Sequence, residues 1–240
     1  MAHAIFRDNE SQLISEFFQN RAPGFFVDVG AADPQLGSQS WCLEQAGWSG
    51  VLVEPRPDCA ERLRRERQAR VYEVACSSPR NAGRTMQLRL RGGFSTLNDS
   101  LVVAGMTAPT AIPVLIRTLD DILTEAGAPD PIDFLSIDVE GHEIEVLEGF
   151  DFNRWKPRLI LIEDHVLDRR LHHWLQKRHY KWVRRSGLNG WYVPVDCSMS
   201  VSWIGRLQFV RKYYLAMPAR RVRDAVRHVR ALTGIMPPTR

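Results

Sequence analysis

The sequence predicts an α/β fold with a mostly parallel, doubly wound sheet. From Gly24 to about Val195, short runs rich in Val, Ile, Leu and Phe alternate with charged, helix-like stretches. The runs are apolar at almost every position, which is typical of strands covered on both faces and therefore of a parallel sheet. Strands that alternate with helices over short connections favour a doubly wound arrangement.

The expected elements follow one another in a regular order. Residues 3–20 predict an amphipathic lead-in helix, and GFFVDVG, residues 24–30, predicts a first strand that ends at a glycine. The elements that follow are a helix over 38–46, a strand over 50–55, a helix over 59–68 with Pro57 in its first turn, a strand over 70–76, a strand over 132–138, a helix over 141–149 and a strand over 158–163.

Two further segments complete the expected domain. Residues 180–184 and 190–195 predict a terminal antiparallel hairpin around a glycine-containing turn. Residues 80–117 are less regular and contain several Gly and Pro residues. An insertion of this size beside a sheet is often a substrate loop or a lid.

The net charge of +4 conceals two oppositely charged parts. Residues 1–168 hold 16 Lys+Arg and 26 Asp+Glu, a net of −10, whereas residues 169–240 hold 16 Lys+Arg and two acids, a net of +14. Residues 206–217 and 219–232 predict two basic amphipathic helices. Such helices suit an anionic membrane surface, a partner helix, a dimer interface or packing onto the acidic part of the chain. We expect one domain over residues 1–200 and a basic helical extension over residues 201–240.

Composition excludes several classes of protein. The chain has 240 residues, 44% hydrophobic and 25% charged, which rules out a disordered chain, a collagen-like fibre and a disulfide-rich mini-protein. Its apolar runs fall short of the ~18–20 residues of a membrane span. The N-terminal MAHAIFRDNE is charged where a secretory leader would be apolar. We expect a cytoplasmic protein whose widely spaced cysteines are reduced thiols.

The first two strand ends indicate a site for an adenosine-containing cofactor. Ligands of open α/β sheets bind at the carboxyl ends of the strands. Gly30 ends the first strand and allows the backbone to approach a ligand closely. Glu54 ends the second strand, 24 residues later, where a carboxylate can accept hydrogen bonds from both ribose hydroxyls.

The loop after Gly30 favours S-adenosylmethionine over NAD. A dinucleotide needs G-x-G-x-x-G so that its pyrophosphate can lie at a helix N-terminus. The chain has Ala31-Ala32-Asp33-Pro34 instead, without the later glycines and with a carboxylate that would repel phosphate. S-adenosylmethionine is cationic at sulfur and carries no phosphate, and it suits an acidic loop.

Acidic residues and histidines follow two further strands. Asp138 ends one strand, and Glu163 and Asp164 end the next. These three carboxylates would repel one another unless a cation or a proton lay among them, and oxygen ligands suit Mg²⁺. His142 and His165 are candidate bases, since neutral imidazole is available near pH 7. The open alternative is catalysis without a metal, with Asp138 facing the cofactor and Glu163 orienting a histidine.

Several segments together resemble the FkbM family of S-adenosylmethionine-dependent methyltransferases. They are SQLISEFF, GFFVDVGAADP, GWSGVLVEPRPDCAERLR, VYEVACS, RTLDDIL, DFLSIDVEGHEIEVLEGFD and LILIEDH. The resemblance implies a Rossmann-like methyltransferase fold with an added antiparallel strand. It also implies cofactor-binding residues: Asp28, Gly30 and Ala31 at the methionine end, Glu54 at the ribose, Pro55 and Arg56 at the adenine, and Ala75 and Cys76 near the base. The chain departs from many methyltransferases at Asp33-Pro34, where they have a second glycine.

Members of this family mostly methylate hydroxyl groups, which implies an O-methyltransferase of a sugar, glycan, glycolipid or related natural product. A hydroxyl needs a base, or a metal that lowers its pKa. The catalytic candidates are therefore His142, His165 and Asp138, with a metal at Asp138, Glu163 and Asp164. The expected partners are a sugar, glycan or lipid-linked acceptor, an anionic membrane at residues 206–240, or a second copy of the chain.

Two other functions remain open at this point. One is a non-catalytic module that keeps the fold and uses its basic C-terminus for recruitment. The other is an NAD oxidoreductase, which the missing glycines disfavour. Nucleic acid is not an expected partner, because the chain lacks the N/D-P-P-Y/F tetrapeptide of enzymes that methylate base amines.

Overall fold

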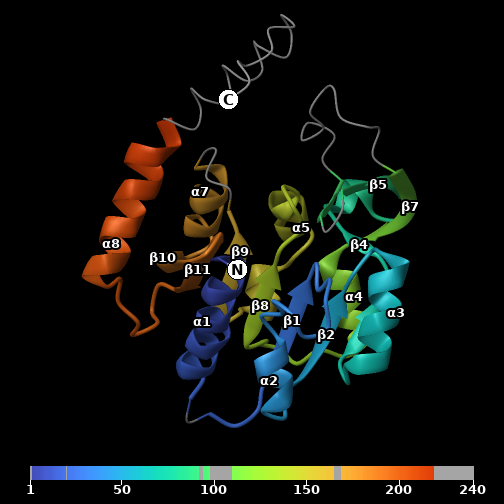
Figure 1. Cartoon of the computed structure of the whole chain (residues 1–240), viewed down its shortest axis with the longest axis horizontal. Coiled ribbons are helices and arrows are strands. Elements are labelled where there is room, and N and C mark those ends of the chain that lie inside the picture. Colours follow the sequence, from blue (N-terminus) through green and yellow to red (C-terminus); the bar gives the residue numbers. More distant parts are fainter. Residues whose placement is uncertain (1, 20, 92–93, 98–109, 165–168, 219–240) are drawn as a thin grey trace, which may run out of the picture.

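A seven-stranded sheet forms the centre of the computed structural model, which describes residues 2–19, 21–91, 94–97, 110–164 and 169–218 (Figure 1). Its strands in spatial order are β10 (Tyr180–Ser186), β11 (Asn189–Pro194), β9 (Leu159–Glu163), β8 (Phe134–Ile137), β1 (Phe25–Val29), β2 (Ser49–Val53) and β3 (Arg70–Tyr72). Strands β3, β2, β1, β8 and β9 are parallel. β11 is antiparallel to β9 and to β10. The predicted α/β fold and its terminal antiparallel hairpin are confirmed.

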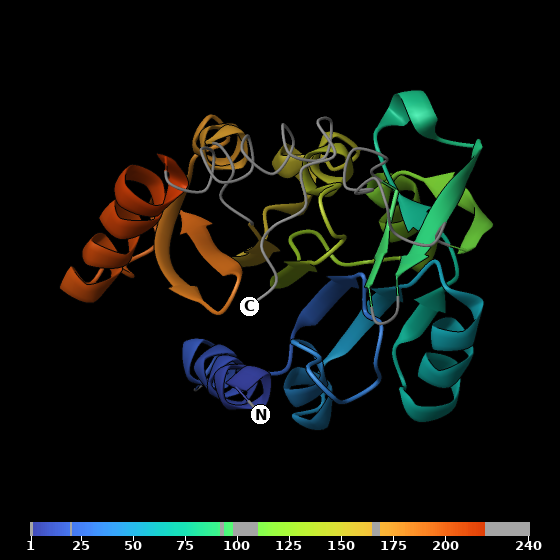
Figure 2. The same cartoon turned by 45° about the horizontal axis from the view of Figure 1, so that its top comes forward.

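Apolar side chains cover both faces of this sheet, as a parallel sheet requires. Phe26 and Leu52 point to one face, where α1 (Ala2–Phe17), α2 (Trp41–Gln45) and α3 (Pro57–Glu66) pack. Val27 and Val51 point to the other face, against α4 (Leu119–Ala126), α5 (Glu143–Glu148), α6 (Phe152–Trp155) and α7 (Arg170–Gln176). Figure 2 shows α1 and α2 on one side of the sheet and α5 and α7 on the other.

A second sheet occupies the region that we expected to be less regular. Its four strands are β4 (Ala75–Cys76), β7 (Thr110–Arg117), β5 (Thr85–Arg91) and β6 (Phe94–Thr96), in that spatial order. The prediction of one strand over 70–76 was wrong, because the chain leaves the large sheet after Tyr72. The signal was present in the sequence: Met86, Leu88 and Leu90 alternate with polar residues, as in a strand with one buried face.

The helix α4 was absent from the predicted elements although both of its ends carry clear signals. The Thr118 side chain accepts a hydrogen bond from the Asp121 backbone N–H at 3.1 Å and caps the N-terminus. Gly127 ends the helix with a φ of 68°, which glycine adopts without steric cost. A helix of eight residues makes only about two turns, which is too short for its apolar periodicity to be recognised in the sequence.

The predicted helix over 206–217 begins three residues earlier, and the helix predicted over 219–232 lies outside the described residues. α8 (Trp203–Val210) starts after Ser202, whose side chain accepts a hydrogen bond from the Gly205 N–H at 3.0 Å. It continues as η3 (Arg211–Ala216), a π-helical segment. In the described part of the chain, no helix is both long and apolar enough to cross a bilayer. The division at residue 200 stays a prediction.

Candidate active site

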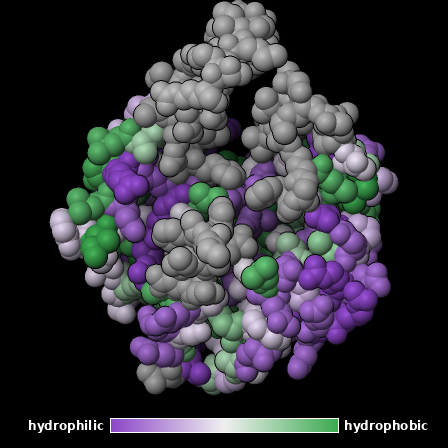
Figure 3. Space-filling model, in the orientation of Figure 1, coloured by the Kyte–Doolittle hydropathy of each residue, from purple (hydrophilic) through white to green (hydrophobic). Residues whose placement is uncertain are grey.

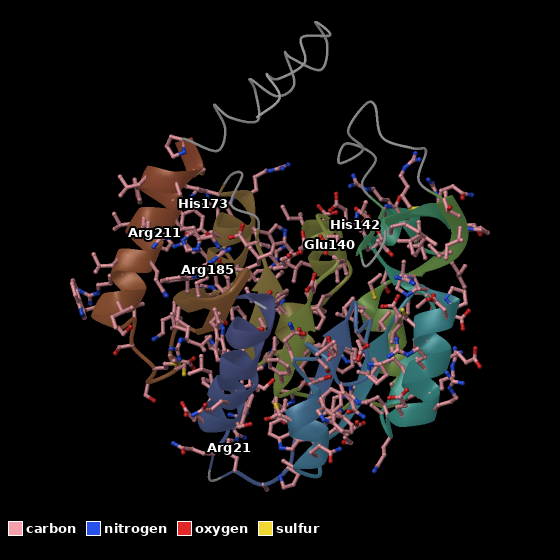
Figure 4. All side chains as sticks on the ribbon, viewed as in Figure 1. Arg21, Glu140, His142, His173, Arg185 and Arg211 are labelled. Atoms are coloured by element: carbon pink, nitrogen blue, oxygen red, sulfur yellow. The ribbon has the colours of Figure 1, made fainter. Side chains whose placement is uncertain are left out.

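A cavity of about 250 Å³ lies at the carboxyl ends of β1, β2 and β8. Residues 29–33, 53–56 and 138–140 form much of its wall, and Leu88 of the second sheet and Leu97, directly after β6, also line it. β1 and β8 are neighbours, but the chain continues from them toward opposite edges of the sheet. A crevice forms at such a point of reversal, and ligands of α/β sheets bind there. Figure 4 shows Glu140 and His142 at this edge.

Gly30, a predicted cofactor-binding residue, forms part of the cavity wall. Its φ is +87°, a conformation that side chains disfavour, and a Cβ at this position would lie 1.9 Å from the Asp138 carbonyl oxygen. Its N–H donates to the Val53 carbonyl at 2.9 Å, which holds the loop across the end of β2. Gly30 and Ala31 therefore offer backbone rather than side chain to a ligand.

Asp28 does not line the cavity, although we expected it at the methionine end of the cofactor. Its side chain is buried within the fold and accepts a hydrogen bond from Ser40 Oγ at 2.5 Å. Burial raises the pKa of Asp28, and the Ser40 hydrogen bond and the Arg67 charge oppose the rise. Asp28 thus supports the loop that leads from Gly30 to α2.

A buried ion pair beneath that loop was missed from the sequence. Arg67 and Glu44 form it, and their side chains are 0% and 4% exposed. Arg67 also donates to the Pro34 carbonyl at 3.0 Å, to Ser38 Oγ at 3.2 Å and to Ser40 Oγ at 3.1 Å. One guanidinium therefore holds three residues of the loop between Gly30 and α2, which we call the cofactor loop because Gly30 and Ala31 are predicted cofactor-binding residues.

Glu54 stands at the end of β2 with both carboxylate oxygens held by backbone amides. Oε2 accepts from the Ala32 N–H and Oε1 from the Arg56 N–H, each at 2.9 Å. Burial raises the pKa of Glu54, and these two hydrogen bonds oppose the rise. Each oxygen keeps a further lone pair for a ligand hydroxyl. Pro55 and Arg56, which the resemblance places at the adenine, also line the cavity.

Ala75 and Cys76, which the resemblance places near the base, lie in the cavity wall, but on β4 of the second sheet rather than at the end of a third parallel strand. Burial raises the pKa of the Cys76 thiol to about 12, so this side chain is a neutral, apolar surface. A planar, weakly polar part of a ligand would pack well against this apolar wall.

The carboxylate of Asp33 is engaged in contacts within its own surroundings, which the sequence does not show. Its Oδ2 accepts from Arg62 Nη2 at 2.9 Å, and its Oδ1 accepts from the N–H groups of Gln35 at 3.0 Å and Leu36 at 2.8 Å. The side chain therefore organises the turn after Ala32. Its charge is balanced in part by Arg62, which weakens the argument that Asp33 alone repels phosphate.

Three carboxylates converge beside the cavity, but they are not the three expected. Oxygens of Asp138, Glu140 and Glu163 lie within 4.8 Å of one another. Burial raises the pKa of Asp138 well above its usual value, and the charges of Glu163 and Glu140 raise it further. One proton shared within this cluster relieves the repulsion.

Asp164 was wrongly assigned to the metal cluster. Its Oδ2 accepts from Lys212 Nζ at 3.1 Å and from the Tyr213 hydroxyl at 2.7 Å, both on η3. Successive residues of an extended chain point to opposite sides. Glu163 and Asp164 therefore cannot both face the same cleft, and the neighbouring Glu140 completes the cluster instead.

His142 lines the cavity, but its ring is held from behind. Ser77 Oγ lies 2.9 Å from Nε2 and accepts a hydrogen bond from Asn81 Nδ2 at 3.0 Å. This contact occupies Nε2, whichever of the two atoms donates the hydrogen. Burial lowers the pKa of His142, in agreement with a neutral ring. His165 lies outside the described residues.

Comparison with known proteins identifies the family. The family model described as the methyltransferase FkbM domain matches residues 28–182, which is more than half of the chain. The chain belongs to the FkbM methyltransferase family. No curated protein matches it. Similar solved structures include a methyltransferase from Geobacter sulfurreducens, at 18% identity and a TM-score of 0.40 with 76% of each chain covered. They also include the N-terminal domain of human METTL16 in complex with SAH, at 13% identity and a TM-score of 0.42 with 78% of this chain and 68% of that chain covered.

The FkbM domain contains the whole cavity. Its match begins at β1 and ends within β10, so it includes the second sheet. Counted in chain order, the seven strands of the large sheet lie in the order 3-2-1-4-5-7-6. The first five follow the Rossmann order as far as the fifth strand, and the antiparallel seventh strand is the addition expected of this methyltransferase fold. The predicted family and fold are confirmed.

Proposed function

We propose that this FkbM protein is an S-adenosylmethionine-dependent O-methyltransferase whose cofactor binds in the cavity between β1, β2 and β8. The observation that carries the proposal is the pair formed by Gly30 and Glu54. The glycine admits backbone contact with a ligand, and the carboxylate is fixed where ribose hydroxyls would reach it. Hydroxyls that donate to a buried carboxylate form strong, charge-assisted hydrogen bonds.

The charges around the cavity favour a sulfonium cofactor over a dinucleotide. Asp138 and Glu140 lie in its wall, and negative groups stabilise a cation. Among the described residues that line the cavity, Arg56 carries the permanent positive charge, and it pairs with Asp58 at 2.6 Å. The helix that follows β1 begins only at Trp41, so its N-terminus does not meet the first turn as a pyrophosphate site requires.

Asp138, which lines the cavity and has a raised pKa, is the base in this proposal. Methyl transfer forms a bond between the acceptor oxygen and the methyl carbon while the carbon–sulfur bond breaks, and the hydroxyl proton must leave. A carboxylate with a raised pKa accepts such a proton better than an ordinary one. His142 has its Nε2 turned to Ser77, so it suits an orienting role. His165 remains a predicted base.

A divalent cation at Asp138, Glu140 and Glu163 is the alternative source of acidity. Their oxygens are close enough to share one ion, and all-oxygen ligands suit Mg²⁺. Exhaustive EDTA treatment separates the two mechanisms. Full turnover after chelation supports Asp138 as the base. Loss of turnover that Mg²⁺ restores, with unchanged S-adenosylhomocysteine binding, supports the metal.

The acceptor in this proposal is a hydroxyl of a sugar, glycan, glycolipid or related natural product. The test is transfer of a deuterated methyl group from S-adenosylmethionine to fractionated cellular glycans and glycolipids, read by mass spectrometry. Labelled ether products support the proposal. Label confined to amine-containing fractions contradicts O-methylation. Cofactor binding without transfer to any fraction favours the non-catalytic alternative.

A further inference from the structure

The helix formed by α8 and η3 is firmly anchored to the FkbM domain through its inner face. Gly205 approaches β10 so closely that a Cβ would lie 2.7 Å from the Val183 carbonyl oxygen. The ring of Phe209 packs against Trp182 and His172, with centroids 5.3 and 5.0 Å away. The helix therefore presents one fixed face outward.

Polar contacts tie the same helix to the edge of the sheet that holds the cavity. Lys212 and Tyr213 are buried and bind Asp164, the residue that follows Glu163 at the carboxyl end of β9. Figure 1 shows the helix at the outer edge of the molecule, beside β10 and α7. Whatever covers its outer face is thus held in a defined position relative to the cavity.

Large apolar side chains form that outer face. Their exposed fractions run from 46% to 71%, and successive members are one to four residues apart, so that they share one side of the helix. We call this set the outer apolar face; its members are Trp203, Ile204, Leu207, Val210, Tyr214 and Leu215. Figure 3 shows hydrophobic residues along this edge, whereas the opposite edge, over α3, is mainly hydrophilic. A contiguous, exposed apolar face on a helix whose other side is fixed to the domain is typical of an interaction surface.

The charges around the outer apolar face are all positive in the described helix. Arg206 and Arg211 are exposed on it, and Arg169 lies with its guanidinium carbon 4.3 Å from the centre of the Tyr214 ring. Residues 201–240 hold nine Lys+Arg and one acid, a net of +8. Trp and Tyr with flanking Arg are the side chains that favour the interface of an anionic bilayer.

We propose that the outer apolar face docks on the surface of an anionic lipid bilayer. The apolar side chains would enter the boundary between headgroups and acyl chains, and Arg206, Arg211 and Arg169 would contact lipid phosphates. A second copy fits less well, because a two-fold interface would bring the same arginines together. The proposal does not depend on the identity of the methyl acceptor.

Cosedimentation with vesicles tests the proposal on the full chain. The probes are vesicles of phosphatidylcholine alone and of an equal mixture with phosphatidylglycerol. Wild-type protein should bind the mixed vesicles, and binding should fall as salt rises. The variant Leu207→Glu/Leu215→Glu should bind at least about tenfold more weakly, since two apolar anchors become anions. Arg206→Gln/Arg211→Gln should lose about fivefold for each arginine.

Leu115→Glu/Leu188→Glu is the matched control. It makes the same change in charge at two leucines that are 47% and 45% exposed on β7 and in the β10–β11 turn. This control should bind as wild type does. Equal binding by Leu207→Glu/Leu215→Glu would overturn the proposal, because residues 219–240, intact in both variants, would then account for it. A wild-type dimer in sedimentation equilibrium that the same variant dissociates would also overturn it in favour of self-association.

A spectroscopic measurement separates a loss of membrane binding from a loss of folding. Lipids brominated in the acyl chain quench tryptophan within reach of the bilayer. Wild-type fluorescence should be quenched by brominated mixed vesicles, and most of this quenching should disappear in Trp203→Phe, a conservative change at a residue 71% exposed. Undiminished quenching in Trp203→Phe would place the contact elsewhere and contradict the proposal.

Discussion

At the scale of single residues, Asp138 connects the electrostatics of the cavity to the proposed chemistry. Its pKa is raised by burial and by two neighbouring carboxylates, so it holds a proton at a pH where an ordinary aspartate has lost it. Activity that depends on its carboxylate should therefore fall as pH drops through this raised value. Asp138→Asn should lower kcat by about 10²–10⁴-fold and remove that acidic limb, with little change in S-adenosylhomocysteine affinity.

The pH dependence of stability checks the same residue without an acceptor. A pKa higher in the folded than in the unfolded state contributes stability at low pH, and this contribution is lost as pH rises through the folded-state value. Urea denaturation of wild type should show this loss, and Asp138→Asn should not. Identical pH profiles for the two proteins would show that the pKa of Asp138 is not raised.

Gly30 gives a second residue-scale prediction. Ala at this position would combine a positive φ with a Cβ 1.9 Å from the Asp138 carbonyl oxygen. Gly30→Ala should lower the free energy of unfolding by at least about 1–3 kcal/mol and abolish cofactor binding. Gly83→Ala is the matched control, since Gly83 has a φ of +77° but no atom near its Cβ. Chemical denaturation and calorimetry of both variants measure the difference.

At the scale of elements, the cofactor loop depends on the buried pair of Arg67 and Glu44. Arg67→Met leaves the Glu44 carboxylate buried without its cation, although two backbone N–H groups still donate to it. We expect a loss of about 3–5 kcal/mol in the free energy of unfolding. Arg64→Met, which removes an exposed pair with Glu73, should change stability little. Urea denaturation of both variants measures the two losses in the free energy of unfolding. Equally small losses would contradict the stabilising role of Arg67.

The sequence predicted the elements that carry local signals and missed those that depend on distant contacts. Gly30 and Glu54 were predicted to lie together because each ends an apolar run, and the structure places both in the wall of one cavity at the edge of the sheet. The pair of Arg67 and Glu44 gave no signal, because 23 residues separate two ordinary charges that only the fold unites. Asp164 was assigned to the metal cluster because the sequence does not show which way its side chain points. The alternation of side chains along the extended chain and the contacts with η3 turn it away from that cluster.

At the scale of the whole molecule, the helix formed by α8 and η3 packs on the FkbM domain through buried contacts. A chain ending after Ser202 would lose the contacts of Lys212 and Tyr213 with Asp164 and would expose the apolar surface that Phe209 covers. We expect this truncation to lower the free energy of unfolding by about 3 kcal/mol or more, mainly because buried apolar surface would meet water. A chain ending after Pro218 keeps both contacts and should match the full chain in thermal denaturation. Equal stability of both truncations would support an independent domain over residues 1–200.

Calorimetry with S-adenosylhomocysteine tests most directly whether the cavity at Gly30 and Glu54 is a cofactor site. We predict one molecule bound per chain, no binding of NAD, and affinity about 10–100-fold weaker in Glu54→Gln, because hydrogen bonds to a charged partner are lost. The amide of Gln would also face the backbone N–H of Ala32 or Arg56, so circular dichroism must show a native fold. No binding of S-adenosylhomocysteine or S-adenosylmethionine, or unchanged affinity in a folded Glu54→Gln variant, would contradict the account.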